Sequence, residues 1–205
     1  MKFEIFVTGP IDVNTYLVYD ELSKEAIAID VGGSAGEIWD KVQELNLNLK
    51  GIYNTHGHFD HILGAKELQE LANCPFFVNS EDNFLVENLS AQMAFYGMGD
   101  AEPPMISGSV NESSKISIGD TVVKVIETPG HTPGGVCYLI DGVLFSGDTL
   151  FYASIGRTDL PGGDYQTLKV SIREKLFTLA DEITVYPGHD CSTSIGHEKQ
   201  YNMMV

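Results

Sequence analysis

The sequence contains few basic residues. Lysine and arginine number 12 among 205 residues, against 29 aspartates and glutamates, which gives a formal net charge of −17 at pH 7. Proteins that bind nucleic acid neutralise phosphates with lysine and arginine, and anionic membrane surfaces attract the same residues. We therefore predict that neither nucleic acid nor a membrane is a partner of this protein.

Long apolar runs and paired cysteines are also missing. No stretch of about 18 apolar residues is present, as a membrane-spanning helix would need, and the N-terminal residues form no apolar signal core. Cys74, Cys137 and Cys191 are odd in number and show no Cys-x-x-Cys spacing, which fits a reducing compartment. The resulting prediction is a cytoplasmic protein.

Apolar residues make up 43% of the chain, and its length suits one large domain, so we expect a single domain over residues 1–205. The hydrophobic patterns predict two halves, each with strands followed by helices and with no linker between them. This order favours two sheets packed face to face with helices outside. The predicted strands are 2–8, 14–19, 25–30, 49–53, 75–79, 115–118, 121–127, 135–140, 143–146 and 183–186. The predicted helices are 35–45 with Ser34 as N-cap, 62–73, 81–89 with Ser80 as N-cap, and 165–179.

One loop is rich in residues that bind metals. Between the strand 49–53 and the helix 62–73 lies Thr55-His56-Gly57-His58-Phe59-Asp60-His61. Imidazole nitrogen and carboxylate oxygen suit Zn²⁺, Fe and Mn²⁺. His56, His58 and Asp60 alternate and so point the same way in an extended or looped backbone, whereas His61 points elsewhere. One short loop can therefore supply two adjacent metals.

Three further residues of ligand type follow predicted strands. His131 lies in Thr128-Pro129-Gly130-His131, Asp148 in Ser146-Gly147-Asp148, and His189 in Pro187-Gly188-His189. Each stands next to a glycine, where backbone can approach closely. A lone histidine is usually structural, but three such positions together with the histidine-rich loop predict one shared site.

The order of these residues resembles a known family. His-x-His-x-Asp-His followed by an isolated His, Asp and His is similar to the metallo-β-lactamase-fold hydrolases, within them to the glyoxalase II-like (hydroxyacylglutathione hydrolase-like) group. Asp30-Val31-Gly32-Gly33, Gly156-Arg157-Thr158-Asp159, Gly162-Gly163-Asp164 and the ending from Gly188 to Glu198 support the likeness. The resemblance covers almost the whole chain. It implies a four-layer αββα sandwich, with two mixed sheets and helices on the outer faces.

The resemblance also implies roles for single residues. One metal would be held by His56, His58 and His131, and a second by Asp60, His61 and His189, with Asp148 bridging both. Asp30 would orient a ligand from behind. Two Zn²⁺ ions per chain are the implied cofactor, and Fe or Mn²⁺ are the other candidates.

The implied reaction is hydrolysis of a small-molecule thioester or ester. Two cations lower the pKa of a bridging water, so that hydroxide attacks the carbonyl, and Asp60 takes or relays the proton. Arg157 is a candidate for binding a substrate carboxylate, or else forms a structural ion pair. Glyoxalase II enzymes carry a further C-terminal helical region that binds glutathione. We expect this region to be absent, because the sequence stops at Val205.

Several other functions fit parts of the sequence. A persulfide dioxygenase, a mononuclear-iron enzyme of the same fold, is similar in the histidine-rich loop and the Gly-Arg-Thr-Asp stretch, and would use His56, His131 and Asp148. Lactonases share the motif as well. Gly32-Gly33-Ser34-Ala35-Gly36 matches the Gly-x-Ser-x-Gly nucleophile elbow of serine hydrolases.

The segment 90–112 breaks the regular pattern and is rich in methionine, aromatic residues, proline and glycine. Long irregular segments in compact domains are often lids or binding loops, and methionine and aromatic side chains suit an apolar ligand. An ordinary surface excursion, packed by its own side chains, is the alternative interpretation.

Overall fold

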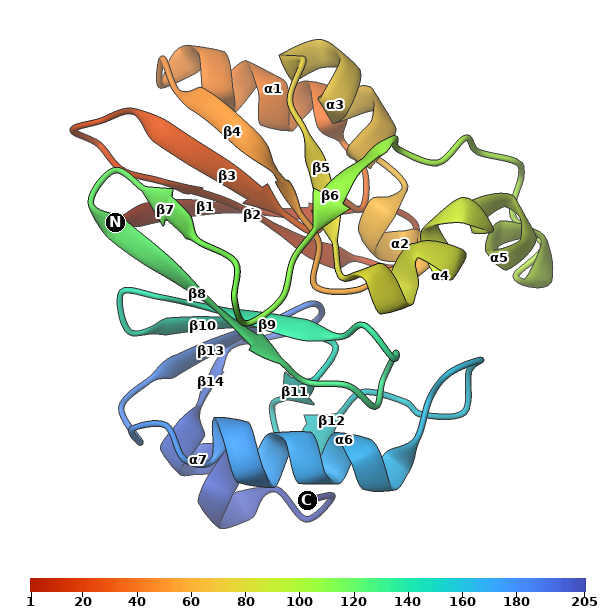
Figure 1. The fold of residues 1–205 in the computed structure, drawn as a ribbon, viewed down its shortest axis with the longest axis vertical. Coiled ribbons are helices and arrows are strands. Elements are labelled where there is room, and N and C mark those ends of the chain that lie inside the picture. Colours follow the sequence, from red (N-terminus) through yellow and green to blue (C-terminus); the bar gives the residue numbers. More distant parts are fainter.

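The computed structural model describes residues 1–205 and shows two six-stranded sheets packed face to face (Figure 1). The first sheet has the order β1-β2-β3-β4-β5-β6. Its first three strands pair antiparallel and the remaining pairs are parallel, so the sheet is mixed. Its strands are β1 Lys2–Thr8, β2 Val13–Tyr19, β3 Glu25–Ile29, β4 Asn48–Tyr53, β5 Phe76–Val78 and β6 Ile106–Ser109.

The second sheet is also mixed and has the order β14-β13-β10-β9-β8-β7. Only β10 and β13 pair parallel. A separate two-stranded ribbon is formed by β11, Leu150–Phe151, and β12, Ser154–Ile155. The six strands are β7 Ile116–Ile118, β8 Thr121–Glu127, β9 Val136–Ile140, β10 Val143–Gly147, β13 Thr184–Pro187 and β14 Thr193–Ser194.

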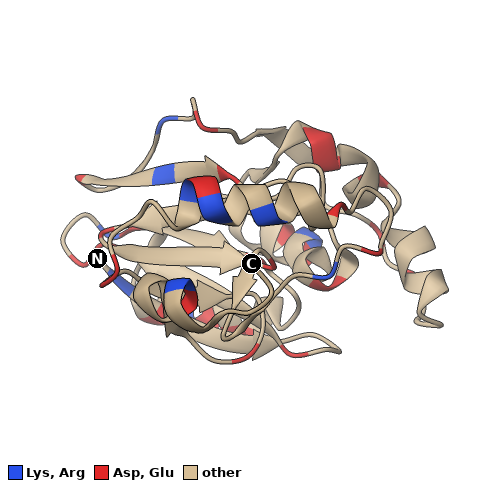
Figure 2. Ribbon diagram, turned by 90° about the horizontal axis from the view of Figure 1, so that it is seen from below, with Lys and Arg blue, Asp and Glu red and all other residues tan.

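Helices cover the outer face of each sheet, which confirms the predicted αββα layering (Figure 1). The first sheet is covered by α1, Ala35–Glu44, and α3, Ala65–Ala72, and the second by α6, Tyr165–Ser171, and α7, Ile195–Tyr201. None of the helices combines the length and the apolar character needed to cross a membrane. Figure 2 shows acidic residues on many elements and few basic ones, as the net charge of −17 requires.

Alternation along the strands builds a core between each pair of layers. In β2, Tyr16 and Val18 face the second sheet and pack with Tyr138 and Phe145, whereas Leu17 faces the helices. Successive side chains of a strand point to opposite faces, and all seven residues of β2 are buried, so this strand is covered on both sides. This burial fixes the register of the central strands and therefore the position of the loops that follow them.

Several element boundaries differ from the prediction. Ser34 precedes α1, but its φ is 49° and its side chain makes no capping bond. The predicted helix 62–73 corresponds to α3, which begins only at Ala65, and a separate short helix that was not predicted, α2, Phe59–Ile62, precedes it. Asn79, not Ser80, caps the next turn by accepting a hydrogen bond from the Glu81 N–H. That turn, η1, spans Ser80–Asp82 and continues into α4, Asn83–Glu87.

The predicted helix 165–179 is also shorter in the structure, because α6 ends at Ser171 and a π-helical turn, η2, spans Ile172–Leu176. The segment 90–112 is more regular than predicted. It begins within α5, Leu89–Phe95, and contains the edge strand β6. Residues 96–105 between them are irregular.

Candidate metal centre

Loops at one end of both sheets bring the predicted ligands together. In the second sheet, β8, β10 and β13 run in the same direction, because β9 lies antiparallel to both β8 and β10, and β13 is parallel to β10. The loops after these three strands carry His131, Asp148 and His189. In the first sheet, the loop after β4 and the short helix α2 carry the histidine-rich motif. All seven predicted ligands therefore lie at one edge of the sandwich.

The first group consists of His56, His58 and His131. Their potential ligand atoms all lie within 4.8 Å of one another, and all three residues are buried. His58 Nδ1 is 2.9 Å from His131 Nε2, so a ring nitrogen of one loop faces a ring nitrogen of the other. Two imidazoles from different sheets thus present nitrogens to the same point.

The second group consists of Asp60, His61 and His189, whose potential ligand atoms also lie within 4.8 Å of one another. Asp60 Oδ2 is 3.2 Å from His189 Nε2 and 3.4 Å from His61 Nε2. Asp148 lies between the groups, because its Oδ1 is 3.3 Å from His61 Nε2 and its Oδ2 is 3.6 Å from His131 Nε2.

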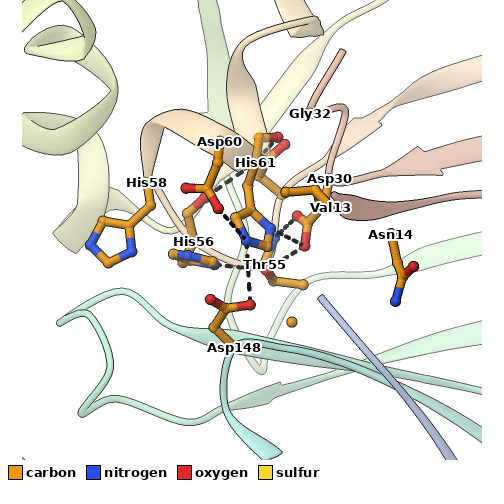
Figure 3. A network of polar contacts seen from close by, with 12 residues as sticks. Val13, Asn14, Asp30, Gly32, Thr55, His56, His58, Asp60, His61 and Asp148 are labelled. Carbon is orange, nitrogen blue, oxygen red and sulfur yellow. Dashed lines mark hydrogen bonds and ion pairs between the residues drawn. The ribbon is translucent and has the colours of Figure 1, made fainter. Parts of the chain in front are cut away.

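Asp30 orients the histidine-rich loop from behind (Figure 3). Its Oδ1 accepts a hydrogen bond from the Thr55 N–H at 2.7 Å, and its Oδ2 accepts one from the Thr55 hydroxyl at 2.7 Å. The same Oδ2 lies 3.0 Å from His61 Nδ1, which leaves His61 Nε2 facing Asp148. Carboxylates that hold a histidine in this way fix its tautomer and ring orientation. Asp30 also forms a third potential ligand group with His56 and His61.

Two further contacts at the site were not predicted. The Arg157 carbonyl lies 2.7 Å from His131 Nδ1, so it fixes the ring with Nε2 toward Asp148. The Asp82 side chain is fully buried and accepts hydrogen bonds from the Gly57 N–H at 2.9 Å, the Thr132 hydroxyl at 2.7 Å and the Gly134 N–H at 2.6 Å. Asp82 therefore ties the loop of the first sheet to the loop of the second.

The sequence gives little indication of either contact. Asp82 opens a short helix, where an acidic residue is common because it favours the helix dipole. Its partners are 25 to 52 residues away in the chain. A backbone carbonyl such as that of Arg157 has no sequence signature at all.

Electrostatics differ between the two groups. Burial lowers the pKa of His56 well below its ordinary value and lowers the pKa of His58 to about 3, so both rings are neutral, the form that binds a metal. At His61, burial acts against the charge, but Asp148 and Asp60 outweigh it and raise the pKa well above its ordinary value. The same attraction overcomes burial and lowers the pKa values of Asp60 and Asp148. The second group therefore favours a positive charge at its centre.

The residues fit a pair of metal ions. His56 Nε2, His61 Nε2 and Asp148 Oδ1 are buried and have no hydrogen-bond partner. Buried polar atoms are normally paired, and binding of a metal ion is one of the few explanations for several orphaned atoms in one place. Imidazole with carboxylate is a donor set for Zn²⁺, Fe or Mn²⁺.

The comparison with known families agrees with this geometry. Residues 8–189 match the metallo-beta-lactamase superfamily, which is most of the chain. The chain belongs to the metallo-beta-lactamase superfamily.

Relatives of this superfamily member match over nearly its full length. Hydroxyacylglutathione hydrolase GloC from Haemophilus influenzae is 37% identical over 206 residues, covering 98% of this chain and 97% of that protein. The crystal structure of TTHA1623 in a di-iron-bound form has a TM-score of 0.89 at 31% identity and covers 98% and 100% of the two chains. ETHE1 from Myxococcus xanthus has a TM-score of 0.81 at 31% identity and covers 99% and 84%.

A cavity of about 320 Å³ opens onto the candidate metal centre of this superfamily member. Arg157 lines it, and its guanidinium forms two hydrogen bonds of 2.7 Å to the Asp159 carboxylate. The position of Arg157 is thus compatible with both predicted roles, which are binding of a substrate carboxylate and a structural ion pair. Five predicted ligands also line the cavity: His58, Asp60, His131, Asp148 and His189.

The serine-hydrolase alternative lacks a partner for its nucleophile. Ser34 is exposed, has a left-handed φ of 49°, and its hydroxyl makes no hydrogen bond. A serine nucleophile needs a base within hydrogen-bond reach. The Gly-x-Ser-x-Gly match therefore reflects the turn before α1 and not a catalytic site.

Proposed function

We propose that this chain is a metal-dependent hydrolase that cleaves a thioester or a related ester, with two divalent cations, Zn²⁺ foremost, as cofactor. The observation that carries the proposal is the convergence of two His/Asp groups from both sheets, with Asp148 between them. The printed name of GloC supports a hydroxyacylglutathione-like thioester, and the di-iron form of TTHA1623 supports a pair of metals.

The proposed ligands divide into two sets that share one carboxylate. Bound cations would activate water near neutral pH and polarise the substrate carbonyl. The first set is His56, His58 and His131, the second is Asp60, His61 and His189, and Asp148 belongs to both.

The chain's own groups prepare the site for this chemistry. Asp60 lines the cavity, where its carboxylate could accept the proton released when water attacks the carbonyl. Asp30 keeps His61 oriented, and the Arg157 carbonyl keeps His131 oriented. Arg157 lines the cavity, and its guanidinium, which pairs with Asp159 here, is the group that would bind a carboxylate of the substrate.

We further propose that residues 1–205 act as one domain on a small-molecule substrate in the cytoplasm, without nucleic acid or a membrane as partner. The shared core between the two sheets supports one domain, since the inner faces of β2 and β9 pack together there. The net charge of −17 supports the absence of polyanionic partners.

The alternative is a mononuclear-iron persulfide dioxygenase, which would use His56, His131 and Asp148 only. The observation that favours it is the position of the Gly156–Asp159 stretch, the part of the sequence shared with those enzymes, because Arg157 of this stretch lines the cavity. The likeness to ETHE1, at 31% identity, also supports this alternative.

Metal analysis together with activity assays distinguishes the hydrolase from the dioxygenase. We expect protein purified without added metal to carry about two ions per chain, to hydrolyse S-lactoylglutathione or another thioester, and to lose this activity on chelation and regain it with Zn²⁺. One iron per chain, with O₂ consumption on glutathione persulfide and no thioester hydrolysis, would support the dioxygenase. Thioester hydrolysis that survives complete chelation would refute both.

A further inference from the structure

A second hollow lies beside the cavity and has an apolar wall. This apolar groove has a volume of about 340 Å³. Its wall is formed from α4, α5 and the loop before α6, by Phe84, Leu85, Phe95, Tyr96, Leu160 and Pro161.

The apolar groove is continuous with the candidate metal centre. Four residues line both hollows: His58, Gln92, Tyr96 and Leu160. His58 is a proposed metal ligand, so one end of the apolar groove reaches the first metal group. A molecule bound in the cavity can therefore extend into the groove without leaving the surface of the protein.

The apolar groove offers a ligand no charge. No lysine, arginine, aspartate or glutamate lines it. The helix α5 contains no charged residue, and it is the tan helix at the right of Figure 2. Gln92, a polar residue of the lining, uses both amide hydrogens on the Gly57 and Leu85 carbonyls, and its oxygen accepts a bond from the Phe59 N–H. The side-chain amide of Gln92 is thus directed into the protein.

The same hydrogen bonds hold α5 against the metal-binding loop. Gln92 contacts Gly57 and Phe59, which flank His58, and the Tyr96 ring packs on the Phe59 ring at a centroid distance of 5.0 Å. The wall of the groove is therefore positioned relative to the candidate ligands and is not an independent flap.

Large apolar side chains are nevertheless exposed here. Phe95 is 77% exposed, Phe84 41% and Tyr96 40%. Contiguous exposed apolar surface next to a site is characteristic of a ligand-binding groove.

We propose that the apolar groove binds an uncharged hydrocarbon arm of the substrate whose carbonyl is hydrolysed at the metal centre. This inference rests on the proposed function and narrows its substrate to thioesters or esters with an apolar arm of several carbons. Arg157 is the only lysine or arginine that lines either hollow, so the groove does not suit a polar arm with several carboxylates.

The test varies the arm and keeps the rest of the substrate constant. We would assay the metal-loaded protein with N-acetylcysteamine thioesters that carry acyl chains of two, four, six and eight carbons. A fully buried methylene contributes about fourfold in affinity, and a half-open groove about twofold. We expect kcat/KM to rise by about tenfold or more from the acetyl to the hexanoyl thioester.

A pair of variants assigns this effect to the groove. Phe95→Ser removes an exposed ring from the wall, and we expect it to lower the hexanoyl-to-acetyl ratio by about threefold or more. Leu22→Ser is the matched control, because Leu22 is 95% exposed in the turn between β2 and β3, and both rates should be unchanged.

Binding of unreactive analogues separates this inference from the proposed function. Calorimetry with the S-hexyl and S-ethyl thioethers of N-acetylcysteamine should show tighter binding of the hexyl compound, by about tenfold, and loss of that preference in Phe95→Ser. If this preference appears but no thioester is hydrolysed, the groove stands and the proposed reaction fails.

Two results would overturn the inference. One is thioester hydrolysis that does not depend on chain length, together with equal binding of the two thioethers. The other is a wild-type dimer that becomes a monomer in Phe95→Ser while the chain-length profile stays the same, because the groove would then cover a second copy of the chain.

Discussion

Replacement of Asp82 tests whether a residue outside the proposed ligand set controls the metal centre. Asp82 is fully buried and bridges Gly57 of the first sheet's loop to Thr132 and Gly134 of the second sheet's loop. His58 and His131 follow and precede these contact points by one residue. Loss of the bridge should therefore let the two proposed ligands move apart.

The expected loss of stability follows from the three hydrogen bonds that Asp82 accepts, of 2.6 to 2.9 Å. In Asp82→Ala the two backbone N–H groups and the hydroxyl lose their acceptor, at about 1–3 kcal/mol for each buried group left unpaired. Removing a carboxylate whose burial raises its pKa offsets part of this cost. We expect a net loss of about 3 kcal/mol in the free energy of unfolding and a metal affinity lower by about 10–100-fold.

Asp82→Asn gives a finer test. One amide oxygen can still accept the Gly134 N–H, but the NH₂ group then faces the Gly57 N–H, which stays unpaired. Its effects should lie between those of the wild type and Asp82→Ala.

Urea unfolding and metal competition against a chelator would measure both quantities on folded protein. Asp40→Ala serves as control, since Asp40 is exposed on α1 without a hydrogen bond, and should change stability by less than about 0.5 kcal/mol. Reduced stability with unchanged metal affinity would refute the bridging role of Asp82.

Three further predictions concern single sites. Gly188→Ala should lower metal affinity at least about tenfold by equilibrium dialysis, because a Cβ there would lie 2.3 Å from Asp148 Oδ1 and 2.6 Å from His61 Cε1. Gly36→Ala, with nothing within 4 Å, should leave affinity unchanged and stabilise by about 0.4–1 kcal/mol. Burial raises the pKa of the Cys137 thiol from 9.0 to about 11, so the unfolded chain ionises first and stability falls as pH rises through this window. Cys137→Ala should reduce the loss in unfolding free energy between pH 8 and pH 10.5 by about 2 kcal/mol, and an unchanged loss would contradict the assignment. A thiol-specific disulfide reagent should modify one cysteine in the native protein, the exposed Cys191, and reaction of all three would contradict the burial of the other two.

The central strands could be predicted because one physical rule determines them. Strand β9 is apolar over its length and β2 is apolar apart from Asn14 and Thr15, as burial between two layers favours, and their predicted positions agree with the structure to within a residue. The proximity of His131, Asp148 and His189 followed from their position after strands, which turned out to run in the same direction. Their roles as ligands remain a prediction.

Boundaries set by tertiary contact could not be predicted. The break between α2 and α3 occurs at Gly64, where a Cβ would lie 2.8 Å from the Gly33 Cα, so close backbone packing and not local propensity decides it. The strand β6 has the sequence Ile-Ser-Gly-Ser, without strand-forming alternation, and owes its conformation to pairing with β5.

Each proposed metal ion would join the two sheets, which links the cofactor to the stability of the sandwich. His56 and His58 lie in the loop that follows β4 of the first sheet, and His131 lies in the loop that follows β8 of the second. Asp60 and His61, in α2 after the same first-sheet loop, face His189, which follows β13 of the second sheet. A ligand that binds only the folded state stabilises it by RT ln(1 + [L]/Kd), about 4 kcal/mol at a thousandfold excess over Kd. Because each ion takes ligands from both layers, this energy opposes separation of the sheets. By the same linkage, a substitution that shortens a side chain in the core between the sheets, for example at Phe145, should weaken metal binding if the resulting cavity changes the spacing of the layers.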